Sequence, residues 1–157
     1  MADAYVTGLR MLARRELSEA QIRIRLTRRQ FEPDEVDDAV EKLRRDGSLD
    51  DRRTAMACAR TEAHVKRHGQ RRALQQLQAI GIARDLAASA VKEVFADVDE
   101  DHVIEQILER RLRQPGGSER TRPTLRRVHR YLLTQGFDAA RVNAAIRSRV
   151  RHVPHDD

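Results

Sequence analysis

The sequence predicts an all-α protein, an elongated tandem array of three three-helix repeats. Apolar residues recur at intervals of three and four along most of the 157-residue chain, which is the spacing of amphipathic helices. A stretch of about thirty residues that begins at Ser18 recurs without a gap from Gly69 and again from Thr124. Only 39% of the residues are hydrophobic and Trp is absent, which is too little for one thick core but enough for three thin, stacked ones.

The ends of the second helix in each repeat are marked by residue type. Ser18, Gly69 and Thr124 stand at matched N-cap positions, and Gln21 completes a capping box with Ser18. The matched C-terminal positions hold Gln30, Gly81 and Gly136. Glycine is the usual left-handed terminator of a helix, and the apolar residue that follows each position is expected to enter the core. Pro33 then fits the first turn of the third helix.

A longer helix is expected before each pair, at about residues 4–16, 50–68 and 98–113, the last two with acidic residues at their starts. The predicted units are residues 1–47, 48–97 and 98–153, with a loop at 114–119 and a short tail at 154–157. The loop is predicted because Pro, Gly and Ser cluster there.

The charge favours an anionic partner, nucleic acid first, because the net charge is +6 and the pI about 10.3. Residues 1–47 carry ten basic and ten acidic groups, whereas residues 98–157 carry twelve and nine. These totals hide a sharper polarity, because residues 119–151 hold nine arginines and only two acids. This stretch directs the search for contacts to the C-terminal third. In the first repeat, the arginines between Arg14 and Arg29 could instead be matched internally by the acidic helix that follows, and both interpretations stay open.

Nine residues are candidates for partner or DNA contacts. They are Arg25, Arg28, Arg29, Arg71, Arg72, Arg126, Arg127, Arg130 and Tyr131. Double arginines in the first turn of two repeats oppose the helix dipole, which suggests an external anion; a solvated surface is the alternative. Tyr131 is expected either to stack on a base or to lie partly buried against a neighbouring helix.

No chemistry-bearing motif is found, so a binding protein is predicted and not an enzyme. His64 and His68 lie one helical turn apart, but no third metal ligand is evident. The single Cys58 cannot form an internal disulfide, which is typical of a cytoplasmic protein. Neither a signal segment nor a membrane-spanning run is expected, and no cofactor or metal is predicted.

Four motifs resemble the RecX family, the regulatory partners of the bacterial recombinase RecA. They are Leu12-Ala13-Arg14-Arg15-Glu16-Leu17-Ser18, Gly47-Ser48-Leu49-Asp50-Asp51-Arg52, Gly69-Gln70-Arg71-Arg72 and Gln135-Gly136-Phe137. The resemblance runs from about Leu9 to Val150. Ser48 stands where the family usually has an aromatic residue and Ile80 where it often has Lys, so packing and one contact near these positions are in doubt.

The resemblance implies a curved array of helix-turn-helix-like units that lies in the groove of the RecA–DNA filament. It further implies restraint of ATP hydrolysis, strand exchange and coprotease action in recombination, DNA repair and the SOS response. Single- or double-stranded DNA would be contacted directly or through the filament. A monomer is expected, because a three-unit array has no need of self-association. The alternative is a stand-alone helix-turn-helix DNA-binding protein, for which only Arg141 to Arg149 is basic enough to read a groove. A hydrolase using His64 and His68 is a third possibility.

Overall fold

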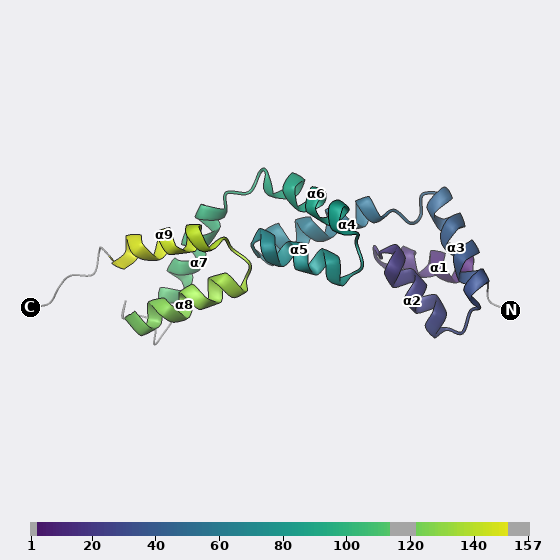
Figure 1. The fold of residues 1–157 in the computed structure, drawn as a ribbon, viewed down its shortest axis with the longest axis horizontal. Helices are drawn as coiled ribbons and strands as arrows, with labels where there is room; N and C mark the ends of the chain where they lie inside the picture. The colour runs from purple at the N-terminus through teal and green to yellow at the C-terminus, as the bar shows by residue number, and fades with distance from the viewer. Residues whose placement is uncertain (1–2, 114–121, 151–157) are drawn as a thin grey trace, which may run out of the picture.

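A computed structural model describes residues 3–113 and 122–150, and the described chain is entirely helical (Figure 1). Unit 1 contains α1 (Ala4–Arg14), α2 (Glu19–Arg28) and α3 (Pro33–Arg45). Unit 2 contains α4 (Asp51–Arg60), continued by the π-helical turn η1 (Thr61–Val65), then α5 (Gln70–Ala79) and α6 (Arg84–Phe95). Unit 3 contains α7 (Glu100–Leu112), α8 (Arg122–Thr134) and α9 (Ala139–Val150). The predicted fold class is confirmed.

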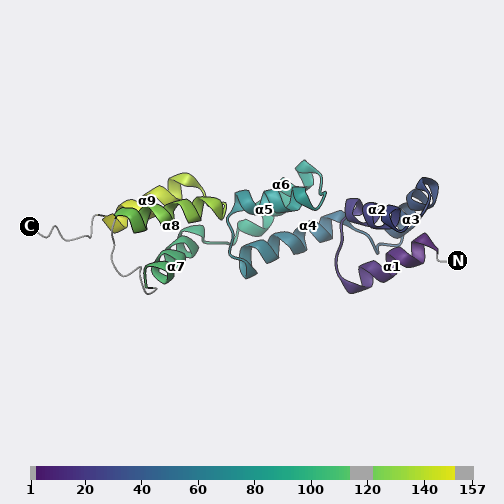
Figure 2. The same cartoon turned by 90° about the horizontal axis from the view of Figure 1, so that it is seen from below.

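The three units follow one another along the long axis, and each repeats one packing plan. The first helix contacts the third in every unit, as α1 with α3, α4 with α6 and α7 with α9, and the second helix also contacts the third. In Figure 2 the first helices lie along one side of the array and the other two helices of each unit along the opposite side. Three separate hydrophobic clusters result, one for each unit, and Leu49 from the segment between α3 and α4 joins that of unit 1. The scarcity of large apolar side chains is thus explained by three thin cores.

The predicted terminators of the second helices adopt the left-handed conformation in all three units. Gln30, Gly81 and Gly136 have φ angles of 67°, 88° and 90°. The next residue in each case donates its N–H to a buried leucine five positions earlier, as Phe31 to Leu26, Ile82 to Leu77 and Phe137 to Leu132. These bonds form the Schellman arrangement that satisfies the last carbonyls of a helix. All three leucines are fully buried.

The start of α8 differs from the prediction. The repeat alignment places the N-cap at Thr124, but the described part of α8 already includes Arg122 and Pro123, so Thr124 lies inside the helix. Pro123 is compatible with a position near the start of a helix, where its fixed φ fits and its missing N–H costs little. Arg126 and Arg127 therefore lie beyond the first turn, whereas Arg71 and Arg72 lie within the first turn of α5. The predicted loop at 114–119 and the tail at 154–157 are outside the described residues.

Consecutive units are joined through the ends of their second helices. The hydroxyl of Ser18, the N-cap of α2, donates to the carbonyl of Ile80 at the end of α5. At the next joint, the N–H of Gly69 donates to the carbonyl of Gln135 (2.8 Å) and that of Arg71 to the carbonyl of Gly136 (3.2 Å). Each joint thus places the positive end of one helix on the negative end of the next, a favourable arrangement of dipoles.

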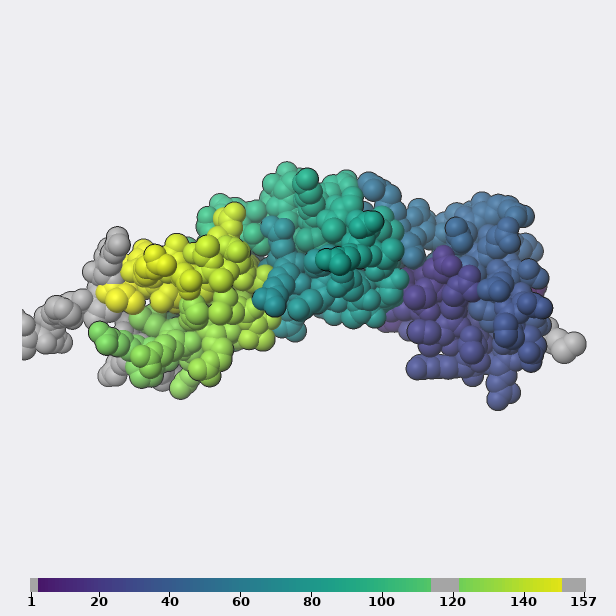
Figure 3. Space-filling model, in the orientation of Figure 1, coloured from purple at the N-terminus to yellow at the C-terminus, as the bar shows by residue number. Residues whose placement is uncertain are grey.

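Both joints require glycine for close approach. A Cβ built on Gly81 would fall well inside van der Waals contact with Ala20, and one on Gly136 would overlap the backbone of Arg72. The equivalent position at the end of α2 is Gln30, and that helix end has no unit stacked on it. Figure 3 shows the units as successive lobes of one extended surface.

Candidate anion-binding surfaces

Six arginines of α1 and α2 converge on one open pocket in unit 1. The pocket has a volume of about 650 Å³, and its basic lining consists of Arg10, Arg14, Arg15, Arg25, Arg28 and Arg29. Its floor is formed by the buried side chains of Thr7 and Met11. No carboxylate lines it, and within the part of the chain that the structure describes none of the six arginines forms an ion pair. We call this site the α1–α2 arginine pocket.

The other arginines of unit 1 are paired with acids. Arg23 binds Asp37 at 2.6 Å and Glu19 at 3.1 Å, and Arg44 lies 3.8 Å from Glu19. The hydrogen bond with Asp37 raises the pKa of Arg23 above its usual value. The internal charge match therefore holds for one face of α2 only. The sequence separated the two faces poorly, because Arg23 and Arg25 lie only two positions apart in the same basic run.

The predicted pair Arg71 and Arg72 lies at the joint between units 2 and 3. Arg71 is exposed, and its backbone N–H is used in the joint. The Arg72 Nη1 atom lies 3.4 Å from both the carbonyl of Thr134 and the Oε1 atom of Gln135. Arg72 is therefore partly occupied with holding the array together, and only Arg71 presents an open guanidinium.

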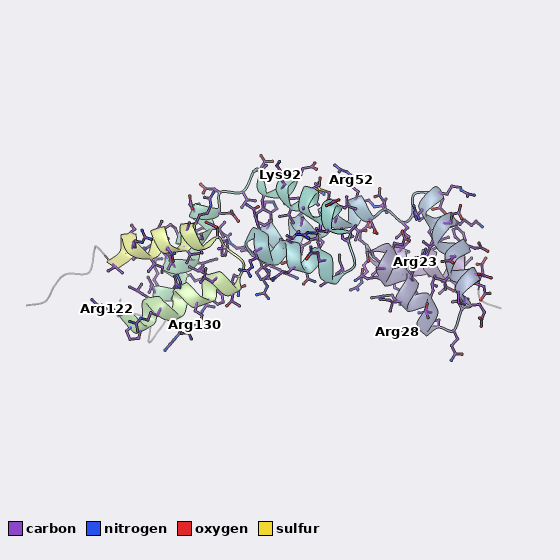
Figure 4. All side chains as sticks on the ribbon, viewed as in Figure 1. Arg23, Arg28, Arg52, Lys92, Arg122 and Arg130 are labelled. Atoms are coloured by element: carbon purple, nitrogen blue, oxygen red, sulfur yellow. The ribbon has the colours of Figure 1, made fainter. Side chains whose placement is uncertain are left out.

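The third group of candidates lies on α8. Arg126, Arg127 and Arg130 are exposed, and Figure 4 shows Arg130 pointing outward from the edge of α8, with Arg122 at its start. Tyr131 is half-buried instead of outward-facing, and the guanidinium carbon of Arg111 lies 3.2 Å from its ring centroid. That ring face is occupied by a cation–π contact, so the partly buried alternative for Tyr131 describes the structure.

Two further arginines of unit 3 are held by α7. Arg141 binds Asp101 at 2.9 Å, and this hydrogen bond raises the pKa of Arg141. Arg149, with only 18% of its side chain exposed, lies 2.7 Å from Glu105 and 3.7 Å from Glu109. The basic segment from Arg141 to Arg149 is thus largely neutralised by the helix beneath it.

The histidine pair does not form a metal site. His68 Nδ1 lies 2.5 Å from Oε2 of the buried Glu62, whose other oxygen accepts from Lys66 at 2.8 Å. Burial would raise the pKa of Glu62, but these two hydrogen bonds bring it below its usual value. His64 is exposed. No group of three potential metal ligands occurs in residues 3–113 and 122–150, and no helix there is long and apolar enough to cross a membrane.

Sequence reasoning found three of the six pocket arginines as candidates and missed Arg10, Arg14 and Arg15 as members of the same site. A signal existed, because Thr7, Met11 and Arg14 follow helical spacing on one face of α1 with Arg10 beside them. The convergence itself depends on how α1 packs beside α2, which the spacing within one helix does not specify.

The fold and these surfaces define a class: a tandem helical array with an extended surface that carries exposed arginines. Comparisons with known proteins place the chain more closely. A family model described as RecX, first three-helix domain, matches residues 4–43. The chain is 32% identical over 139 residues to the regulatory protein RecX of Trichlorobacter lovleyi, covering 87% of this chain and 88% of that protein. The chain belongs to the RecX family.

Two other comparisons agree. The regulatory protein RecX of Syntrophotalea carbinolica is 29% identical over 138 residues, which cover 88% of this chain and 90% of the relative. The crystal structure of RecX from Lactobacillus salivarius superposes with a TM-score of 0.80 at 17% identity, covering 92% of this chain and 93% of that one. At that identity the superposition supports the fold alone.

Proposed function

We propose that the chain binds the RecA nucleoprotein filament in the cytoplasm and restrains its ATPase, strand-exchange and coprotease activities. Membership of a family of regulatory proteins supports this role. Such a regulator would act in recombination, DNA repair and the SOS response, and would act as a monomer because the three units already supply an extended surface.

The observation that carries the proposal is the distribution of exposed arginines over an elongated array. The α1–α2 arginine pocket lies in unit 1, Arg71 near the middle, and Arg126, Arg127 and Arg130 on α8 in unit 3. A polymeric partner with regularly spaced anionic groups would meet these arginines together, whereas a small globular partner would reach only one group. A filament that carries DNA has this form, and several weak contacts on one body add to a tight one.

The test is the ATPase activity of RecA on single-stranded DNA with increasing amounts of the chain. Inhibition is expected at near-stoichiometric amounts, and an unchanged rate would overturn the proposal. The chain is added either before or after the filament has assembled. Inhibition of the assembled filament supports direct binding, whereas inhibition only before assembly would indicate simple competition for DNA and contradict it.

The stand-alone helix-turn-helix alternative is less well supported. Its reading segment would be Arg141 to Arg149, yet Arg141 and Arg149 are paired with acids of α7. A recognition helix must bring its basic side chains to base edges. Titrations with random and selected duplexes at several salt concentrations separate the two candidates, since sequence-independent and strongly salt-dependent binding contradicts a site reader.

A further inference from the structure

We propose that the α1–α2 arginine pocket is a binding site for linked phosphate groups, which it holds directly and without RecA. The proposal deepens the proposed function and rests on it for the biological setting. The ligand class, however, is argued from the pocket itself.

Within unit 1 the paired arginines and the unpaired arginines lie on different faces. The unit contains as many acids as bases, and Arg23, Arg44 and Arg45 each find an acid within 4 Å. The six pocket arginines find none among the described residues, although the third helix of the same unit, α3, carries five acids. Like charges gathered around one pocket repel each other, and a bound anion would remove that repulsion.

The charge and volume of the pocket determine which anion fits. The guanidinium group is a planar fork that matches phosphate oxygens bidentately and keeps its charge at any physiological pH. Six guanidinium groups around a pocket of about 650 Å³ offer more hydrogen-bond donors and more charge than one carboxylate or one phosphate can pair with. The volume lies within the ~300–1,000 Å³ of ordinary ligand pockets, so a short run of linked phosphates fits both the charge and the space.

The lining of the pocket offers no group that would recognise a nucleic-acid base. Its neutral lining residues are Thr7 and Met11, so it has neither an aromatic ring on which a base could stack nor an amide to read a base edge. The site therefore recognises phosphates and not bases. Linked phosphates occur in the backbone of a nucleic-acid strand and in free oligophosphates, and the pocket chemistry is the same for both.

Stabilisation of helix ends does not account for the arrangement. Arg14 lies in the last turn of α1, and Arg25 and Arg28 in the last turn of α2, where cations are favourable. Arg10 is in the middle of α1, however, and stabilising two separate helix ends does not require the side chains to share a pocket. Figure 4 shows Arg28 at the end of α2, away from Arg23 among the helices of unit 1.

The test measures binding to the full chain alone, without RecA. A fluorescent single-stranded oligonucleotide is titrated in one experiment, and in a second the binding of tripolyphosphate is measured by calorimetry. The pocket variant is Arg10→Gln, Arg14→Gln and Arg28→Gln, three exposed residues whose loss should leave helicity by circular dichroism unchanged. The matched control is Arg44→Gln, Arg45→Gln and Arg52→Gln, which removes the same charge from ion-paired positions.

The pocket variant is expected to bind the oligonucleotide about tenfold more weakly, and the salt dependence of log K should fall by about 2 for three lost phosphate contacts. The control variant should stay within about twofold of the parent chain. If the parent chain releases heat on binding tripolyphosphate and the pocket variant does not, the ligand is a free oligophosphate. If the parent chain binds the oligonucleotide but not tripolyphosphate, the ligand is the backbone of a nucleic-acid strand. Either result supports the proposal.

Equal weakening in both triple variants would overturn the proposal, because it would show that only net charge matters. Displacement of the oligonucleotide by citrate as readily as by tripolyphosphate would also overturn it, because the site would then not distinguish phosphate from carboxylate. A failure here is distinguishable from failure of the proposed function: if the chain inhibits RecA but the pocket variant binds phosphates normally, only the pocket assignment falls.

Discussion

Units 1 and 3 contain similar numbers of basic groups but use them differently. By residue totals unit 1 is neutral and unit 3 basic, yet six arginines gather around one pocket in unit 1. In unit 3, Arg141 and Arg149 are paired with acids of α7, and Arg111 covers the ring of Tyr131. The separation of charges between faces, and not their sum, therefore determines which surface is open to an anion.

The ends of the second helices show why the two units differ. The C-terminal end of α8 is covered by α5, and Gly136 is built into that joint. No other unit of the described chain covers the C-terminal end of α2, and Arg28 and Arg29 are exposed there. One helix end thus serves assembly and the equivalent one is free to serve binding.

The largest effect is expected from a substitution that disrupts the joint between units 2 and 3. Gly136→Val places a branched side chain at φ 90° and against the backbone of Arg72. The free energy of unfolding should fall by about 3 kcal/mol or more, measured by denaturant titration. As a control at the free end, Gln30→Gly relieves a left-handed residue and should raise stability by about 1 kcal/mol. Equal losses at both ends would contradict the distinction between them.

A smaller effect is expected on the inhibition of RecA ATPase, and it compares the α1–α2 arginine pocket with the exposed arginines of α8. The pocket triple variant should require about tenfold more protein than the parent chain for half-inhibition of RecA ATPase, whereas Arg126→Gln, Arg127→Gln and Arg130→Gln together should require about threefold more. The reason is that only Arg126 of these three lines a pocket, which it shares with Arg122 and Arg147, whereas six arginines line the pocket of unit 1. A greater loss with the α8 variant would reverse the ranking and return the principal contact to unit 3.

The smallest effect is expected when an arginine of unit 3 is freed from its acidic partners, as the pocket arginines of unit 1 already are. Glu105→Gln with Glu109→Gln removes both acids from Arg149, and oligonucleotide binding by the chain should tighten by about twofold. Glu41→Gln with Glu93→Gln adds the same net charge elsewhere and serves as the control. Identical tightening in both would show that the release of Arg149 contributes nothing of its own.

Local signals in the sequence predicted much of the fold. The Ser18–Gln21 capping box is present, and the left-handed ends at Gly81 and Gly136 follow from glycine itself. Gln30 was placed correctly only because the repeat aligns it with those glycines. Thr124 was wrong as a cap, because Arg122 and Pro123 before it are already helical. The sequence could not reveal the α1–α2 arginine pocket, since its members belong to two helices whose relative rotation is fixed by the buried side chains between them.

The helix-end joints also restrict how far the three repeats can diverge in sequence. In both joints the second helix of one unit begins on the glycine-containing turn of the next, which admits no side chain. The turn residues Gly81 and Gly136 are therefore fixed by the neighbouring unit as well as by their own φ angles. Gln30 is exposed and has only its left-handed φ to satisfy among the described residues, so the same turn can carry a side chain in unit 1.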